Sequence, residues 1–158
     1  MPQHLRRHDE LGQIHFITVS CYRRLPLFGT PQARNIVVQC MREARDRLSF
    51  RWIGYLVMPE HVHWLCYPQS EGEKLIPISS VLLSLKTSIG RHVKRYWRGI
   101  WAANRSLGYA VLDRWASGPE TSKPIWTTRG IDVNLETFEH LLSRLEYCHH
   151  NPVKRGLV

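Results

Sequence analysis

Alternating hydrophobic and polar positions mark three strands in the first part of the chain. Residues 12–22 (GQIHFITVSCY) alternate and are rich in β-branched and aromatic side chains, which favour extended backbone. Residues 50–58 and 61–67 have the same character. Only Pro59 and Glu60 separate them, and proline cannot continue a central ladder of hydrogen bonds. The pattern therefore predicts one strand, followed later by an antiparallel hairpin with a tight turn.

Apolar residues at helical spacing predict three helices. The first begins at Thr30-Pro31, because threonine caps a helix N-terminus and proline fits the first helical position. The second opens near Pro77. The third runs from about Asn134 to Asn151, since a residue that precedes proline disfavours helical geometry. The apolar positions are Ile36, Val37, Cys40, Met41, Ala44 and Leu48; Ile78, Val81, Leu82, Leu85, Ile89, Val93 and Tyr96; and Leu135, Phe138, Leu141, Leu142 and Leu145.

The order of elements is strand, helix, strand, strand, helix, weak strand, helix. The weak strand is expected at residues 124–128, at the edge of the sheet. Residues 99–123 contain several Gly, Pro, Ser and Thr and predict a loop with a short element inside it. This order is typical of an α+β fold, a ferredoxin-like antiparallel sheet with helices packed on one face. The length predicts a single domain spanning 1–158.

Charge narrows the class of partner. Twenty-two Lys and Arg against thirteen Asp and Glu give a formal net charge of +9, which favours a polyanion such as nucleic acid. The N-terminus lacks the apolar stretch of a signal peptide, and no run is long enough to span a membrane, so we expect a cytoplasmic protein. Four scattered cysteines without C-x-x-C spacing argue against a cysteine-based zinc site and fit reduced thiols.

Candidate chemistry lies at two places. Side chains alternate across a strand, so His61 and His63 share one face and are spaced to hold one metal ion. With nine histidines in the chain, an H-x-H pair also arises by chance, and packing is the alternative explanation. Tyr147 lies on the polar side of its predicted helix, away from the leucines, and Asn151 follows one turn later. Two imidazoles and an amide oxygen suit Mg²⁺ or Mn²⁺, although zinc accepts the same ligand types.

Four segments then resemble a known family. Residues 56–63 (LVMPEHVH) resemble the MPNH-x-H block of single-tyrosine HUH transposases, with Glu where many members have Asn. Residues 146–158 (EYCHHNPVKRGLV) resemble the Y-I-x-x-N-P-V-K-x-G block of the REP-associated tyrosine transposases. Residues 15–19 resemble the first strand of this family. Trp126 with Arg129 resembles the tryptophan-containing segment before the family's last helix. The resemblance covers most of the chain, and the spaced pair of blocks is its specific part.

The resemblance implies an HUH endonuclease fold and assigns a role to each motif residue. His61 and His63 would be the metal ligands, Asn151 the third ligand, and Tyr147 the nucleophile. The enzyme would nick single-stranded hairpin DNA, form a 5′-phosphotyrosine bond and rejoin strands. Both homodimers and monomers occur among the relatives, so the resemblance is compatible with a homodimer.

The basic residues provide the expected contacts with DNA phosphates, and unpaired bases would stack on Trp97 or Trp101. The alternative function is a module that binds hairpin nucleic acid without cutting it. A larger replication-initiation or relaxase-type HUH nuclease fits the short chain and late tyrosine less well. The residues expected to bind DNA are Arg6, Arg7, Arg23, Arg24, Lys86, Arg91, Lys94, Lys154 and Arg155.

Overall fold

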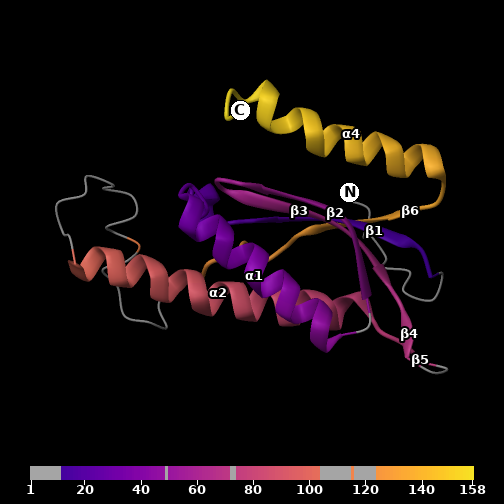
Figure 1. The fold of residues 1–158 in the computed structure, drawn as a ribbon, viewed down its shortest axis with the longest axis horizontal. Helices are drawn as coiled ribbons and strands as arrows, with labels where there is room; N and C mark the ends of the chain where they lie inside the picture. The colour runs from indigo at the N-terminus through magenta and orange to yellow at the C-terminus, as the bar shows by residue number, and fades with distance from the viewer. Residues whose placement is uncertain (1–11, 49, 72–73, 104–114, 116–123) are drawn as a thin grey trace.

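The structure, a computed structural model, describes residues 12–48, 50–71, 74–103, 115 and 124–158. Its centre is a four-stranded antiparallel sheet (Figure 1). A second, small sheet consists of two short strands. The main strands, in the order in which they lie side by side, are β2 (Phe50–Met58), β3 (His61–Pro68), β1 (Ile14–Ser20) and β6 (Ile131–Leu135), and the small sheet pairs β4 (Ser70–Glu71) with β5 (Lys74–Leu75).

The helices cover both faces of the sheet. Helices α1 (Pro31–Arg47) and α2 (Ile78–Ala103) pack under one face, and α4 (Phe138–Lys154) crosses the other (Figure 1). A short 3₁₀ turn, η2 (Tyr22–Arg24), follows β1. The order of strands and the first two helices confirm the predicted ferredoxin-like α+β fold. The prediction that all helices lie on one face is wrong for α4, because each face of the sheet presents its own apolar cluster.

Two apolar clusters hold the layers together. The larger one lies between the sheet and the first two helices and includes Ile17, Trp64 and Leu85. The smaller one lies under α4 and is built on buried Phe16, Leu65, Leu135 and Cys148, with partly buried Ile14, Leu56, Leu141 and Leu145 packed around them. Phe16 and Ile17 are consecutive, so alternation along β1 supplies both clusters.

The start of α1 and the β2–β3 hairpin are where the sequence predicted them. Thr30 caps α1 by accepting a hydrogen bond from the Ala33 backbone N–H at 3.2 Å, and Pro31 occupies the first turn. The turn at Pro59 and Glu60 is fixed by two backbone hydrogen bonds. Its carbonyls accept from the N–H groups of Phe28 and Cys21, so the hairpin tip is tied to the chain that leaves β1.

The C-terminal third differs from the prediction in four places. The last strand is β6, whereas Trp126 in the predicted strand makes only an isolated bridge with Cys21. Leu135 therefore ends a strand, and α4 begins three residues later, after the Thr137 cap. The predicted buried stripe of α4 is also wrong at two positions, because Phe138 and Leu142 are exposed. Finally, α4 continues through Pro152 to Lys154.

The helix α4 approaches the sheet closely at Gly54. A Cβ atom at this position would lie 2.9 Å from Cδ2 of Leu145, which is too short for a normal contact. The glycine therefore leaves the space that one leucine of α4 fills. The strand in which it lies has a register irregularity between Trp52 and Gly54, where the ladder with β3 skips a residue.

We expect Gly54→Val to lower the free energy of unfolding by about 1–3 kcal/mol, because the added side chain overpacks the small cluster under α4. In a Leu145→Ala background the same substitution should cost much less, since the space then exists. Urea unfolding of the two single variants and the double variant measures the coupling. Equal losses in both backgrounds would contradict this account of the contact.

Candidate active site

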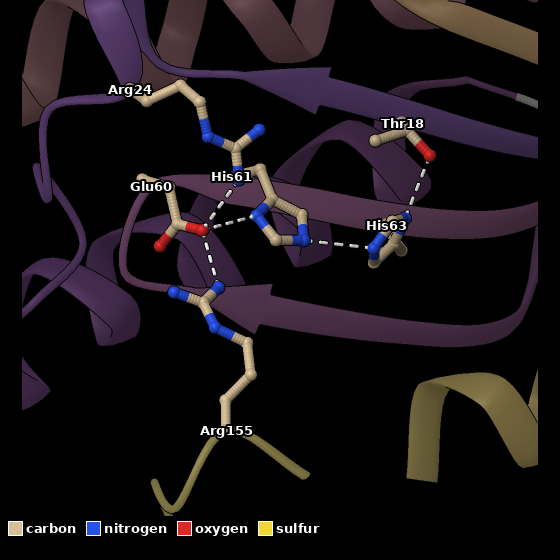
Figure 2. Close-up of polar contacts among 6 residues, drawn as sticks. All are labelled: Thr18, Arg24, Glu60, His61, His63 and Arg155. Atoms are coloured by element: carbon tan, nitrogen blue, oxygen red, sulfur yellow. Dashed lines mark hydrogen bonds and ion pairs between the residues drawn. The ribbon is translucent and has the colours of Figure 1, made fainter. Parts of the chain in front are cut away.

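The two histidines at the start of β3 converge on one point. His61 and His63 project toward the α4 side of the sheet, and Val62 between them enters the larger core. Their Nε2 atoms lie 3.0 Å apart (Figure 2). Two nitrogen ligands about 2.1 Å from a metal ion and at right angles to each other are separated by about 3 Å. The imidazole pair is therefore spaced to hold a single cation.

Each imidazole is held from behind at Nδ1. The hydroxyl of Thr18 lies 2.8 Å from Nδ1 of His63, and the carboxylate of Glu60 lies 3.1 Å from Nδ1 of His61 (Figure 2). Such partners fix the orientation of metal-binding histidines and their tautomers. The β1–β3 register places Thr18 opposite His63, so the sheet itself sets this contact.

The partners assign the protons of the metal-free site. A carboxylate can only accept, so Nδ1 of His61 carries a proton and its Nε2 is a lone pair. That lone pair accepts from Nε2–H of His63, whose Nδ1 then accepts from the Thr18 hydroxyl. A cation bound by both Nε2 atoms requires His63 to move its proton to Nδ1. Thr18 can accommodate this change because a hydroxyl both donates and accepts.

Both imidazoles are neutral near pH 7. Burial, together with the smaller effects of the nearby His61 and Arg144, lowers the pKa of His63 to about 4. Burial also lowers the pKa of His61, against the opposing effect of the Glu60 carboxylate. A neutral imidazole keeps the lone pair that a metal ion needs.

Tyr147 lies beside the histidine pair although it is distant in the sequence. Its ring centroid is 5.3 Å from that of His63, at an interplanar angle of 80°. Phe16 completes the cluster by stacking on His63 at 5.2 Å and meeting Tyr147 edge-on at 6.3 Å. The tyrosine is 45% exposed, so its ring contacts the site while solvent and substrate can still reach it.

Asn151 lies one turn after Tyr147 on α4 and is half-buried. No group of three His, Cys, Asp or Glu side chains in the described residues is arranged to hold a metal ion. An amide oxygen, which is outside these four residue types, is also a ligand that hard divalent cations accept. Burial raises the pKa of the adjacent Cys148 to about 11, so this thiol stays protonated and is a poor ligand. The role of Asn151 stays a prediction.

Glu60 is a residue of the site whose importance the sequence analysis missed. Its Oε1 atom accepts from Arg24 at 2.9 Å and from Arg155, besides its contact with His61 (Figure 2). Burial alone would raise the pKa of Glu60, but Arg155 and His61 outweigh it and the pKa is lowered. One carboxylate oxygen thus joins the chain after β1, the hairpin turn and the end of α4. The sequence signal that could have indicated this role is a carboxylate directly before the H-x-H motif, in a chain rich in arginine.

The predicted DNA-binding residues fall into two groups. Arg24 and Arg155 lie at the site on Glu60, and exposed Lys154 is the neighbour of Arg155. Arg23 is exposed in η2 and lies over the ring of Tyr22. The second group lines a groove with Trp126 on the other face of the sheet and comprises Lys86, Arg91 and Lys94 of α2. Arg6, Arg7 and most of residues 99–123 lie outside the described residues.

The stacking prediction fails for one of the two tryptophans. Trp97 is buried, and its indole N–H donates to the carbonyl of Leu27 at 2.9 Å, so the ring belongs to the core. Trp101 is half-buried near the end of α2.

Among the helices that the structure describes, none combines the length and the apolar character needed to cross a bilayer.

Two solved structures share this architecture. One is a REP-associated tyrosine transposase bound to a REP hairpin, with a TM-score of 0.66 and 20% sequence identity over 99% of this chain and 76% of that chain. The other, from Deinococcus radiodurans R1, is described as a "putative transposase", with a TM-score of 0.51 and 16% identity over 88% of each chain. The chain has the fold of these transposase structures. No protein-family model matches the sequence, and no curated protein matches it either.

We expect Thr18→Val to lower the free energy of unfolding by about 1–3 kcal/mol, because it leaves the buried Nδ1 of His63 without a partner. Thr18→Ser keeps the hydroxyl and should retain most of the stability. In metal-free wild type, ¹⁵N–¹H spectra should show a proton on Nδ1 of His61 and on Nε2 of His63. An Nδ1 proton on both rings, or a Thr18→Val protein as stable as wild type, would contradict the proton assignment.

Proposed function

We propose that this protein is a metal-dependent single-strand DNA endonuclease and strand transferase of the REP-associated tyrosine transposase type. It acts on hairpin DNA through a 5′-phosphotyrosine intermediate. The observation that carries the proposal is the contact between Tyr147 and His63, with the two histidine Nε2 atoms 3.0 Å apart. A nucleophile beside a pair of neutral imidazoles is the arrangement that metal-assisted attack on phosphate requires.

Two further facts support a DNA substrate. The solved structure with the higher TM-score holds a REP hairpin, and its fold extends over nearly the whole of this chain. The net charge of +9 supplies attraction to a polyanion. A homodimer and a cytoplasmic location stay predictions.

The cation would be held by Nε2 of His61 and His63, and the amide oxygen of Asn151 would complete the protein ligands. The neutral nitrogens, their fixed Nδ1 partners and an oxygen ligand fit Mg²⁺ or Mn²⁺. When bound, the metal ion supplies charge stabilisation at the scissile phosphate. Glu60 and Thr18 keep both rings turned toward the shared point throughout.

Tyr147 performs the covalent step. Its hydroxyl oxygen forms a bond to phosphorus while the bond from phosphorus to the 3′-oxygen breaks, and the leaving oxygen takes a proton. The phenol proton is lost to water, which reaches the half-exposed ring. A 3′-hydroxyl of another strand reverses the step and joins new ends. The phosphotyrosine bond conserves the energy of the broken bond, so no nucleotide cofactor is required.

We expect Tyr147→Phe to abolish the covalent protein–DNA adduct while hairpin binding remains within a few-fold of wild type, since only the hydroxyl is lost. Labelled single-stranded hairpins with Mn²⁺, separated on a denaturing gel, report the adduct. Tyr55→Phe is a matched control, because Tyr55 is also exposed but lies on edge strand β2. An adduct that survives Tyr147→Phe would refute the nucleophile. Binding without any adduct in wild type would identify a non-catalytic binding module instead.

We expect Asn151→Ala to raise the Mn²⁺ concentration for half-maximal adduct formation by about 10-fold or more, while Asn151→Asp keeps an oxygen ligand and much of the affinity. Chelation should stop the reaction in wild type. Mn²⁺ binding measured by electron paramagnetic resonance gives a readout independent of activity. Asn35→Ala, at an exposed position of α1, is the control. An Asn151→Ala protein that binds Mn²⁺ like wild type would remove this residue from the ligand set.

A further inference from the structure

Arg144 lies at the site although no sequence motif includes it. It precedes Tyr147 by three residues on α4, a spacing that places both side chains on neighbouring positions of one helix face. Its guanidinium carbon lies 5.0 Å from the ring centroid of Phe16. The same ring stacks on His63 and contacts Tyr147, so the guanidinium is part of the ring cluster that surrounds the nucleophile.

The three arginines of the site differ in how their charge is matched. Arg24 and Arg155 both donate to Glu60. Arg144 is half-buried and forms no ion pair with any carboxylate in the part of the chain that the structure describes. Its partner is the aromatic face of Phe16, which attracts a cation but leaves guanidinium N–H groups free to donate. A partly desolvated cation in this situation has unused capacity for an anion.

We propose that Arg144 binds a non-bridging oxygen of the scissile phosphate and holds that phosphate for in-line attack by Tyr147. The inference rests on the proposed function and assigns a substrate contact to a further residue. Three observations carry it. The cation has no carboxylate partner among the described residues, it is about one helical turn from the nucleophile, and it lies on the ring that also packs against the metal-ligand candidate His63. A phosphate between the phenol and the imidazole pair would meet this guanidinium.

Arg144 takes no proton in the reaction. The bonds that form and break are those at phosphorus, from the Tyr147 oxygen and to the 3′-oxygen, and the guanidinium keeps its charge throughout. Its contribution is electrostatic, because negative charge spreads over the phosphoryl oxygens in the transition state. The substitution of this residue should therefore reduce the rate of adduct formation more than it weakens DNA binding.

The test compares Arg144→Met with wild type in single-turnover reactions at saturating hairpin DNA and Mn²⁺. We expect the rate of adduct formation to fall about 100-fold, with hairpin affinity changed only a few-fold. Arg144→Lys keeps a charge but loses the planar fork, so its rate should lie between the two. Arg42→Met, on the exposed surface of α1, should react like wild type.

A neutral analogue of the phosphate tests whether the guanidinium of Arg144 contacts the scissile phosphate. With a methylphosphonate at the scissile position, the difference between wild type and Arg144→Met should nearly vanish, whereas a methylphosphonate one phosphate away should leave it in place. If Arg144→Met loses the same factor on neutral and charged phosphates, its role is to pack on Phe16 and the proposal fails. If Arg144→Met does not fold, Arg144→Lys on the same substrates decides in the same way.

The outcomes separate this inference from the proposed function. Adduct formation by wild type together with an unaffected Arg144→Met protein overturns the role of Arg144 alone. The absence of any adduct in wild type overturns both. A loss that disappears only with the neutral scissile phosphate supports both.

Discussion

The contact between α4 and the open face of the sheet decides whether this molecule has an active site. The histidine pair comes from the hairpin, and the tyrosine comes from a helix far along the chain. They meet only because α4 crosses the sheet at the level of Phe16 and Gly54. Each aliphatic side chain fully buried contributes about 1.5–3 kcal/mol, whereas an ion pair with exposed guanidiniums contributes about 1 kcal/mol at most. The small apolar cluster therefore supplies the stability of this contact, and the bond from Arg155 to Glu60 joins the end of the helix to the hairpin turn.

Glu60 lies next to the proposed cation site, but its contacts point to a supporting role and not to that of a ligand. Its Oε1 atom is engaged by two guanidiniums and by the back of one imidazole. The carboxylate thus supports the proposed cation site through His61, whose Nδ1 proton it holds. Arg144, on the ring of Phe16, adds a third guanidinium near the histidine pair, so the positive charges there outnumber the one carboxylate of Glu60. That charge favours a phosphate diester over a neutral substrate.

Much of the fold could be predicted because its signals are local. Thr30-Pro31 caps a helix, and the hairpin is set by a proline turn between two strands rich in apolar and aromatic residues. The last strand gave no such signal. Asp132 is buried and bonds to His15 on β1, so a polar residue occupies a position that alternation assigns to an apolar one. A hydrogen-bonding partner more than a hundred residues away cannot be inferred from a local pattern, and the strand was placed too early as a result.

The same reasoning separates what could and could not be predicted of the site. His61 and His63 are marked by their own spacing, and Tyr147 by its position off the leucine stripe, so all three could be named. Arg144 has no distinctive spacing, and Glu60 is marked only by its place beside the H-x-H pair, because the contacts of both depend on partners that the fold brings to them.

The positions of the basic residues on the surface are the feature that the sequence predicts least well. A positive net charge predicts a polyanionic partner, but it does not indicate which face of the molecule binds that partner. The structure divides the described candidates between the α4 side of the sheet and a groove on α2 beyond the opposite face. Cations on opposite faces of one sheet cannot contact the same phosphate. A nucleic acid that reaches both groups must therefore pass around the edge of the sheet. One that stays at the histidine pair meets, among the basic residues that the structure describes, those near Glu60 and Phe16.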